Sequence, residues 1–192
     1  MYSSLLGRLY KKGGVILNYF KIDDCDVANG PGIRVSIWVS GCRLQCPGCH
    51  NKDAQNFKNG QEWNLFSIKE LVKALSQQFI TGITLTGGHP LEYENLPEVY
   101  NIIEMVKKYY PHLNIWLYTG YTLKPADFDT SADCGWNALL RNQILAKCDV
   151  VVDGPYIQEE RDITLKWRGS RNQRVIDVKK TIEKGEIVLF CD

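Results

Sequence analysis

Short apolar runs alternate with amphipathic stretches along most of this 192-residue chain. Four runs rich in β-branched or aromatic residues each stop at a glycine, a pattern typical of strands that end in turns. They cover 33–40 (IRVSIWVS), 82–86 (GITLT), 114–120 (NIWLYTG) and 148–154 (CDVVVDG), with 173–178 and 186–190 as weaker candidates. The fourth run is unbroken, which suits a sheet covered on both faces.

Three stretches between these runs have the apolar spacing of helices. Ser67 begins a capping-box pattern ahead of LVKALSQQF at 71–79. Asn95 is placed to cap a second helix that runs towards Tyr109, and residues 136–146 predict a third. Strands and helices therefore alternate along the chain.

Such alternation predicts an α/β protein with a parallel sheet and right-handed crossovers. A complete eightfold βα barrel takes roughly 250 residues, more than this chain has. We expect an open or partial (β/α) barrel of five or six βα units, formed by one domain over residues 18–192. Residues 1–17 are expected to be an N-terminal extension, either disordered or accessory. In folds of this kind the chemistry lies at the carboxyl ends of the strands.

Composition and charge argue against two classes of partner. The net charge of +1 gives no reason to expect nucleic acid or an anionic membrane, although basic residues gather at 166–174. No run approaches the roughly 18 apolar residues that span a bilayer. The first residues lack the pattern of a signal peptide, so we expect a cytoplasmic protein. In that reducing compartment, clustered cysteines favour a metal site over disulfides.

Three of the seven cysteines, Cys42, Cys46 and Cys49, follow the first predicted strand with C-x3-C-x2-C spacing. Thiolates select zinc, copper(I) or an iron–sulfur cluster. A structural zinc site takes four ligands, normally in two separated pairs, and this chain has no second C-x-x-C; zinc stays the weaker alternative. A [4Fe–4S] cluster ordinarily takes four cysteines, so three would leave one iron open to another molecule. An open metal position is useful to a catalyst.

Further motifs surround the cysteines in a fixed order. They are NGPGIRVSIWVSGC (29–42), CPGCHNK (46–52), LTGGHPL (85–91), LYTGY (117–121), VVDGPY (151–156) and KWRGSRNQR (166–174). The cysteine spacing resembles the signature of the radical S-adenosylmethionine enzymes. The whole set resembles the anaerobic ribonucleoside-triphosphate reductase-activating proteins, over most of the chain.

The resemblance implies a specific chemistry. The open iron of a [4Fe–4S] cluster with three cysteine ligands would chelate the amino and carboxylate groups of S-adenosylmethionine. One electron would then cleave the cofactor to methionine and a 5′-deoxyadenosyl radical, which removes a hydrogen atom from a glycine of the reductase's large subunit. A flavodoxin-like protein would supply the electron. The sequence leaves open whether the chain forms a homodimer.

The resemblance also implies cofactor contacts. The turn Gly87-Gly88-His89 follows the second predicted strand, and its glycines let backbone approach a ligand. The family assigns this turn to the methionine amino group, yet usually has an acidic residue where this chain has His89. A neutral imidazole accepts one hydrogen bond, whereas a protonated one repels an ammonium group. Without the cysteines, an ordinary strand-end turn would be the preferred interpretation.

Other contacts are expected from both sides of the third cysteine and from a later strand end. Gly48, Cys49 and His50 are placed near the adenine by the resemblance, with an exposed loop histidine as the alternative for His50. Asp153 ends the fourth predicted strand and either orients the cofactor or satisfies a turn. The motif at 167–170 (WRGS) either shapes the cofactor pocket or contacts the reductase.

Other functions remain as alternatives. The nearest rival hypotheses are an activase of a different glycyl-radical enzyme and a small radical enzyme that acts on a pterin-like metabolite. The larger activases often carry additional C-x-x-C clusters, which this chain lacks. The non-enzymatic alternatives are an iron–sulfur electron carrier and a zinc-stabilised binding module.

Overall fold

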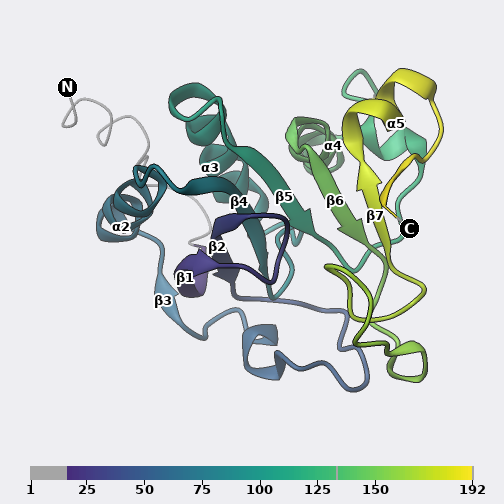
Figure 1. Cartoon of the computed structure of the whole chain (residues 1–192), viewed down its shortest axis with the longest axis horizontal. Coiled ribbons are helices and arrows are strands. Elements are labelled where there is room, and N and C mark those ends of the chain that lie inside the picture. Colours follow the sequence, from purple (N-terminus) through teal and green to yellow (C-terminus); the bar gives the residue numbers. More distant parts are fainter. Residues whose placement is uncertain (1–16, 133, 192) are drawn as a thin grey trace.

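The fold is built on an open eight-stranded sheet (Figure 1). The computed structural model describes residues 17–132 and 134–191. Four neighbouring central strands run in parallel: β2 (Ile33–Val39), β4 (Ile80–Gly87), β5 (Asn114–Tyr118) and β6 (Val150–Asp153). These are the four strands that the apolar runs predicted.

Antiparallel strands extend the sheet on both sides. On one side lie β1 (Asn18–Asp26) and β3 (Gln61–Glu62), and on the other lie β7 (Arg174–Asp177) and β8 (Leu189–Cys191). The α/β class is therefore confirmed, but the sheet is not closed and the expected five or six βα units are too many. After β6 the chain returns through a long loop, and β7 pairs antiparallel, so the parallel series stops at four strands.

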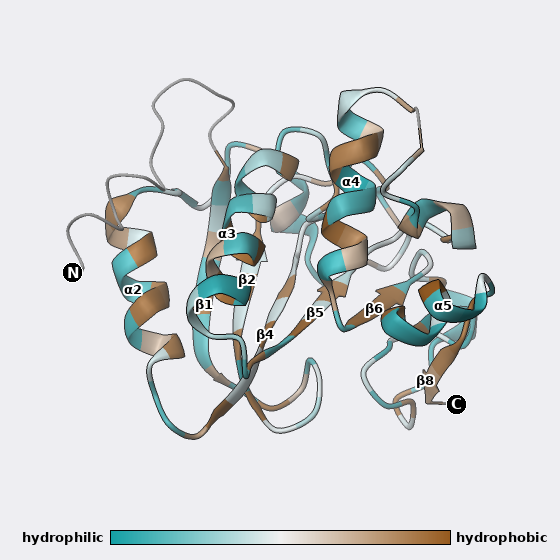
Figure 2. Ribbon diagram, turned by 90° about the horizontal axis from the view of Figure 1, so that it is seen from above, coloured by the Kyte–Doolittle hydropathy of each residue, from teal (hydrophilic) through white to brown (hydrophobic). Residues whose placement is uncertain are grey.

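Helices cover one face of the sheet; the first three connect the parallel strands, and the last connects β7 to β8. They are α2 (Leu65–Leu75), α3 (Leu96–Tyr109), α4 (Trp136–Lys147) and the short α5 (Val178–Lys184), with 3-10 turns η1 (Lys52–Gln55), η2 (Pro125–Phe128) and η3 (Gln158–Glu160). Figure 2 shows α2, α3 and α4 lying along the same side of the strands. That arrangement follows when successive crossovers have the same hand.

Alternation within β2 separates two environments. Val35, Ile37 and Val39 belong to the main hydrophobic core, which includes Leu71 of α2 and Ile103 of α3. The alternate side chains of β2 lie on the other face of the sheet. On that face Arg34 and Ser36 are buried, and Trp38 lines a cavity together with residues of the β6–β7 loop.

A buried arginine dominates the polar face. The Arg34 guanidinium is fully buried and donates to Thr84 Oγ1 at 2.7 Å, Asn114 Oδ1 at 2.7 Å and the Ile83 carbonyl at 2.8 Å. Burial lowers the pKa of Arg34 to about 10, with the charges of Tyr118, Asp26 and Asp149 acting in the opposite direction. Its bonds join β2 to β4 and β5 and rigidify the sheet.

Two predicted helix starts differ in detail. Ser67 is the third residue of α2 rather than its cap: Asn64 Oδ1 accepts from Phe66 N at 2.8 Å, and Ser67 Oγ accepts from Asn64 N at 3.2 Å. Asn95 precedes α3 as expected, but its side chain makes no cap bond and instead donates to backbone carbonyls near the cysteines. Tertiary contacts thus replaced the local cap.

The expected N-terminal extension stays a prediction, because residues 1–16 lie outside the described residues. Leu17, the first described residue, is buried, and its carbonyl accepts from Trp63 N at 2.8 Å. None of the described helices is long and apolar enough to cross a membrane.

Candidate functional site

The cysteine loop begins where β2 ends and is closed by backbone hydrogen bonds. Gly41 N donates to the Ala54 carbonyl at 2.7 Å, and Cys42 N donates to the Gln55 carbonyl at 3.0 Å. Gly41 has φ 95°, and a Cβ there would collide with the Phe57 ring, so this position requires glycine. The loop leaves the sheet and returns through η1 to its own start.

Cys42, Cys46 and Cys49 are free, partly exposed thiols of this single loop. Burial raises the pKa of Cys42, and the charges of Glu92 and Cys46 act in the same direction. Within residues 17–132 and 134–191, no three His, Cys, Asp or Glu side chains are grouped to hold a single metal ion. The donor set is three soft thiols, which fits an iron–sulfur cluster.

The Gly-Gly turn is bonded directly to the cysteine loop. β2 and β4 are parallel neighbours, with Val39 opposite Gly87. Gly88 N donates to the Val39 carbonyl at 2.6 Å, and His89 N donates to the Gly41 carbonyl at 2.8 Å. A Cβ on Gly88 would lie 2.7 Å from two carbonyl oxygens of the loop. The expectation that both motifs share one edge of the sheet is confirmed.

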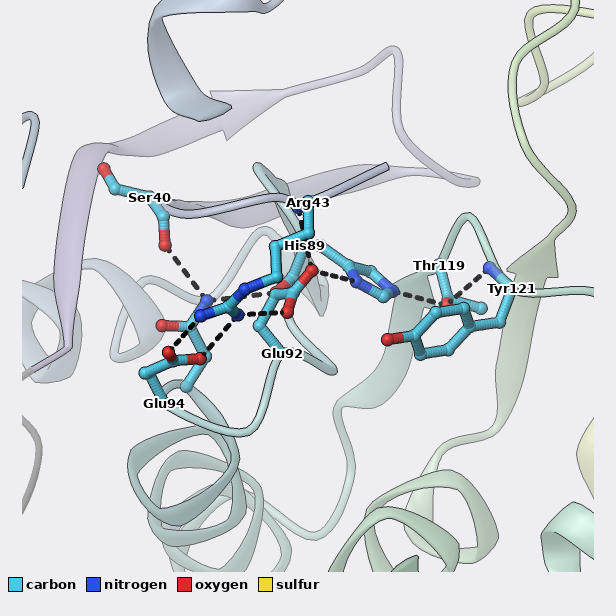
Figure 3. Close-up of polar contacts among 8 residues, drawn as sticks. Ser40, Arg43, His89, Glu92, Glu94, Thr119 and Tyr121 are labelled. Atoms are coloured by element: carbon cyan, nitrogen blue, oxygen red, sulfur yellow. Dashed lines mark hydrogen bonds and ion pairs between the residues drawn. The ribbon is translucent and has the colours of Figure 1, made fainter. Parts of the chain in front are cut away.

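An ion-pair network fixes the start of the cysteine loop (Figure 3). Glu92 Oε1 accepts from the Arg43 backbone N at 2.9 Å, and Oε2 accepts from Arg43 Nη1 at 2.6 Å. The same guanidinium binds Glu94 and lies over the Phe57 ring at 4.3 Å. Burial would raise the pKa of Glu92, but hydrogen bonds from His89 and Arg43 outweigh it and lower this pKa to about 2.

The His89 side chain points into the protein. It is 1% exposed, with Nδ1 3.3 Å from Glu92 Oε1 and Nε2 2.8 Å from Thr119 Oγ1, and its ring meets Tyr121 edge-on at 4.4 Å (Figure 3). Thr119 Oγ1 also accepts from Tyr121 N at 3.1 Å. A neutral imidazole that donates from Nδ1 and accepts the Thr119 hydroxyl proton at Nε2 satisfies every group. Both ring nitrogens are thereby occupied within the protein.

A cavity of about 320 Å³ lies beside the strand ends. Strand residues Trp38, Thr86, Gly87 and Tyr118 line it, and His50 of the cysteine loop borders it. The remaining lining comes from the β1–β2 turn, through Ala28 and Asn29, and from the β6–β7 loop, through Tyr156, Leu165, Trp167, Arg168, Gly169 and Gln173. Its size is that of a small-molecule site.

Features of the cavity wall fit a polar ligand. Trp38 Nε1 and Arg168 Nε are buried and have no hydrogen-bond partner among the described residues. Gly48 has φ 72° and lies against Gln158, which accepts from the Tyr156 hydroxyl at 2.9 Å. The cysteine loop therefore contacts the wall of the cavity. The residues present suit a cofactor with acceptor groups placed between them.

Known proteins are similar to this chain in sequence over most of its length. A family model described as a 4Fe-4S single cluster domain matches residues 28–176. The anaerobic ribonucleoside-triphosphate reductase-activating protein of Enterobacteria phage T4 is 39% identical over 161 residues, covering 83% of this chain and 93% of the phage protein. The proteins of that name from Vibrio cholerae serotype O1 and Escherichia coli K12 are 38% and 33% identical, covering 82% and 83% of this chain and 96% and 97% of theirs.

The chain belongs to the family of anaerobic ribonucleoside-triphosphate reductase-activating proteins. The resemblance drawn from the motifs is thus confirmed. The family model begins in the β1–β2 turn and ends within β7, so its span includes the cysteine loop, the Gly-Gly turn and the whole cavity.

Asp153 is bonded to Arg174 and to the backbone of Leu123. Its carboxylate is fully buried, with Oδ1 3.0 Å from Arg174 Nε and Oδ2 2.5 Å from Arg174 Nη2, and it accepts from Leu123 N at 2.8 Å. It is not among the residues that line the cavity. The geometry favours the alternative in which Asp153 satisfies local structure, because both oxygens are already bonded.

Several lining residues were not identified from the sequence. Asn29 was included only as the first residue of the motif at 29–42, and Trp38 and Tyr118 were assigned only to strands. Alternation places Trp38 and Tyr118 on the face opposite the helices, so their position in the strand was the available signal. The motif at 167–170 contributes three residues to the cavity, as expected if it shapes the pocket.

Proposed function

We propose that this chain is an iron–sulfur activase that cleaves S-adenosylmethionine reductively and generates a glycyl radical on anaerobic ribonucleoside-triphosphate reductase. One observation carries the proposal. The backbone of the loop that carries three thiols is hydrogen-bonded to the Gly-Gly turn, and His50 of the loop and Gly87 of the turn line a cavity whose other lining residues include unpartnered donors. The names of the relatives support the reductase as the partner.

Cys42, Cys46 and Cys49 would hold a [4Fe–4S] cluster and leave one iron open. When bound, cluster and cofactor supply the chemistry: one electron splits S-adenosylmethionine into methionine and a 5′-deoxyadenosyl radical, which takes a hydrogen atom from a glycine of the reductase. The protein's own contribution is positioning and protection from water.

Backbone of the Gly-Gly turn would bind the methionine amino group. Gly87 lines the cavity, and a Cβ there would collide with the Trp38 backbone, so this position of the cavity wall requires glycine. The turn, rather than the imidazole of His89, would supply the acceptors, because both ring nitrogens are already bonded. His50 borders the cavity beside Cys49 and would lie against the adenine. Gly48, which has no side chain, lets the cysteine loop pack closely against Gln158.

Aromatic side chains would restrict the radical to its target. Tyr156 and Trp167 from the β6–β7 loop face strand residue Tyr118, whose hydroxyl donates to the Trp167 carbonyl at 2.7 Å. Burial raises the pKa of Tyr118, so its hydroxyl stays protonated at neutral pH. A wall held in this way excludes water from a site that handles a reactive radical.

The remaining features of the proposal concern organisation and partners. Residues 18–192 would act as one radical S-adenosylmethionine domain in which the open sheet serves as a partial barrel. The protein would work in the cytoplasm and receive its electron from a flavodoxin-like donor. The absence of additional C-x-x-C clusters from the sequence favours an activase of the reductase over the larger activases of other glycyl-radical enzymes.

Electron paramagnetic resonance tests the proposal. Anaerobically reconstituted protein is mixed with a reductase large subunit, reductant and S-adenosylmethionine. We expect a cluster signal that changes on cofactor addition, followed by a glycine-centred radical on the reductase, and neither with Cys46→Ala. A colourless protein that binds zinc would support the binding module instead. A cluster signal indifferent to the cofactor would support an electron carrier.

A further inference from the structure

Four arginines lie between the end of β6 and the start of β7, and two of them are paired with aspartates. Arg171 pairs with Asp162 at 3.0 Å, and Arg174 pairs with Asp153 at 2.5 Å. Neither Arg161 nor Arg168 makes a salt bridge within residues 17–132 and 134–191, but Arg161 is exposed, whereas Arg168 is partly buried and its Nε is shielded from solvent without a hydrogen-bond partner. A shielded N–H without an acceptor is unfavourable, and native proteins normally pair such groups.

A second unpartnered donor borders the same cavity. Trp38 Nε1 comes from β2, whereas Arg168 comes from the β6–β7 loop, so the two donors belong to different walls. Indole nitrogen donates only, and guanidinium has five donors and no acceptor. Whatever completes these two groups must supply acceptors. A carboxylate does so best, because it pairs with guanidinium through two parallel hydrogen bonds.

The backbone also fixes this arginine in place. Trp167, directly before it, has φ 57°, a left-handed conformation uncommon for a residue with a side chain. The Tyr118 hydroxyl donates to its carbonyl at 2.7 Å, and its ring packs edge-on against Trp116 at 5.1 Å. Strain held by surrounding contacts is concentrated at functional sites. Here those contacts set where the next residue, Arg168, leaves the chain.

We propose that Arg168, together with Trp38 Nε1, forms the subsite of the cavity that binds the carboxylate of the ligand. This inference rests on the proposed function, which identifies that ligand as S-adenosylmethionine. Its sulfonium and ammonium groups repel a guanidinium, so its single carboxylate is the group that Arg168 would bind. A carboxylate has two oxygens, so it could bind a metal through one oxygen and accept hydrogen bonds from Arg168 through the other.

Equilibrium binding to the cluster-loaded protein tests the subsite without relying on turnover. Binding of S-adenosylmethionine is measured for wild type, Arg168→Gln, Arg168→Lys and Trp38→Phe. Lys166→Gln, which removes the same charge two residues away on an exposed side chain, is the matched control. Iron content and thermal unfolding verify that each variant is folded and loaded.

We expect Arg168→Gln to weaken binding roughly 10- to 100-fold, the range of hydrogen bonds to a charged group. Arg168→Lys should retain part of the affinity, because it keeps the charge but loses the planar guanidinium that forms two parallel hydrogen bonds with a carboxylate. Trp38→Phe should cost a few-fold, and Lys166→Gln should bind like wild type. Methylthioadenosine, which has no carboxylate, should bind wild type and Arg168→Gln equally.

Wild-type affinity in Arg168→Gln, or equal weakening in the Gln and Lys variants, would overturn the subsite. So would an Arg168→Gln defect that appears only when the reductase is added, because the carboxylate would then belong to the partner. Failure of the proposed function gives a different result: the cluster-loaded wild type would not bind S-adenosylmethionine at all.

Discussion

Glu92 binds Arg43 twice, through the backbone N–H at 2.9 Å and through the guanidinium at 2.6 Å. Arg43 directly follows Cys42, and Glu92 lies three residues after His89, so this pair joins the cysteine loop to the segment behind the Gly-Gly turn. The two residues are 49 positions apart in the sequence. The pair holds the loop in place through protein contacts alone.

Replacing Glu92 with Gln should loosen the cysteine loop. The amide keeps one acceptor but loses the charge that Arg43 pairs with, and Glu92 is only 3% exposed. We expect a loss of about 1–3 kcal/mol in the free energy of unfolding, measured by urea titration, and faster loss of iron to a chelator. Glu94→Gln is the matched control. Because the Arg43–Glu94 pair is more exposed, that variant should lose under 1 kcal/mol.

A methyl group at Gly88 should separate the turn from the loop. Its Cβ would lie 2.7 Å from the carbonyl oxygens of Gly41 and Ala54, and backbone atoms cannot rotate away as a side chain can. We expect Gly88→Ala to lose about 1–3 kcal/mol of stability and to take up less iron on reconstitution. Gly185→Asn, at an open left-handed position after α5, should change neither quantity appreciably. Normal iron uptake by Gly88→Ala would contradict the close contact.

The parts predicted from the sequence depend on local pattern. The four parallel strands are continuous apolar runs, and the cysteines and Gly-Gly turn follow the first two strands directly, so parallel pairing was enough to place both motifs on one edge. β1 was missed because NYFKIDDCD mixes charged and apolar residues at an exposed position beside β2. Residues with this composition do not produce a clear strand signal.

The parts that were not predicted depend on contacts between distant segments. Glu92 looks like an ordinary charged residue until the fold brings it to Arg43. Asp153 occupies a strand end, where catalytic residues are common, but its role is decided by Arg174, 21 positions later. His89 likewise points to Thr119, 30 positions away. No spacing rule contains such pairings, because they are set by how the loops pack.

Replacing Asp153 tests whether this residue supports local structure or binds the cofactor. Asp153→Asn would leave the partly buried Arg174 guanidinium without its anion, and we expect a loss of about 3 kcal/mol in the free energy of unfolding. S-adenosylmethionine affinity of the folded, cluster-loaded variant should stay within about twofold of wild type. Asp162→Asn, which breaks the more exposed pair with Arg171, should cost clearly less stability than Asp153→Asn. A stable Asp153→Asn variant that has lost affinity for S-adenosylmethionine would show that Asp153 belongs to the cofactor site.

Asp26 should make stability depend on pH through the turn that carries Asn29. Burial would raise the pKa of Asp26, but hydrogen bonds from Ser36, Asn29 and Ala28 outweigh it and hold this pKa below its ordinary 3.8. A lowered folded pKa means that the carboxylate stabilises the fold fully above about pH 4, and that this contribution is lost as pH falls through the folded value.

The measurement compares urea unfolding of wild type and Asp26→Asn between pH 7 and pH 3. We expect the variant to be less stable by about 1–2 kcal/mol at pH 7, with the difference shrinking as the pH falls below 4. Asp24→Asn, at an exposed neighbouring position, should behave like wild type throughout. A difference that grows towards low pH would show that the sign is wrong.

Reductive cleavage of S-adenosylmethionine is the most direct test of the proposed activity. Anaerobic protein with one reconstituted cluster per chain is reduced and incubated with the cofactor, and 5′-deoxyadenosine and methionine are quantified. The proposal predicts both products in equal amounts, and none from Cys46→Ala. Fully loaded wild type that forms neither product, or equal turnover in Cys46→Ala, would contradict it.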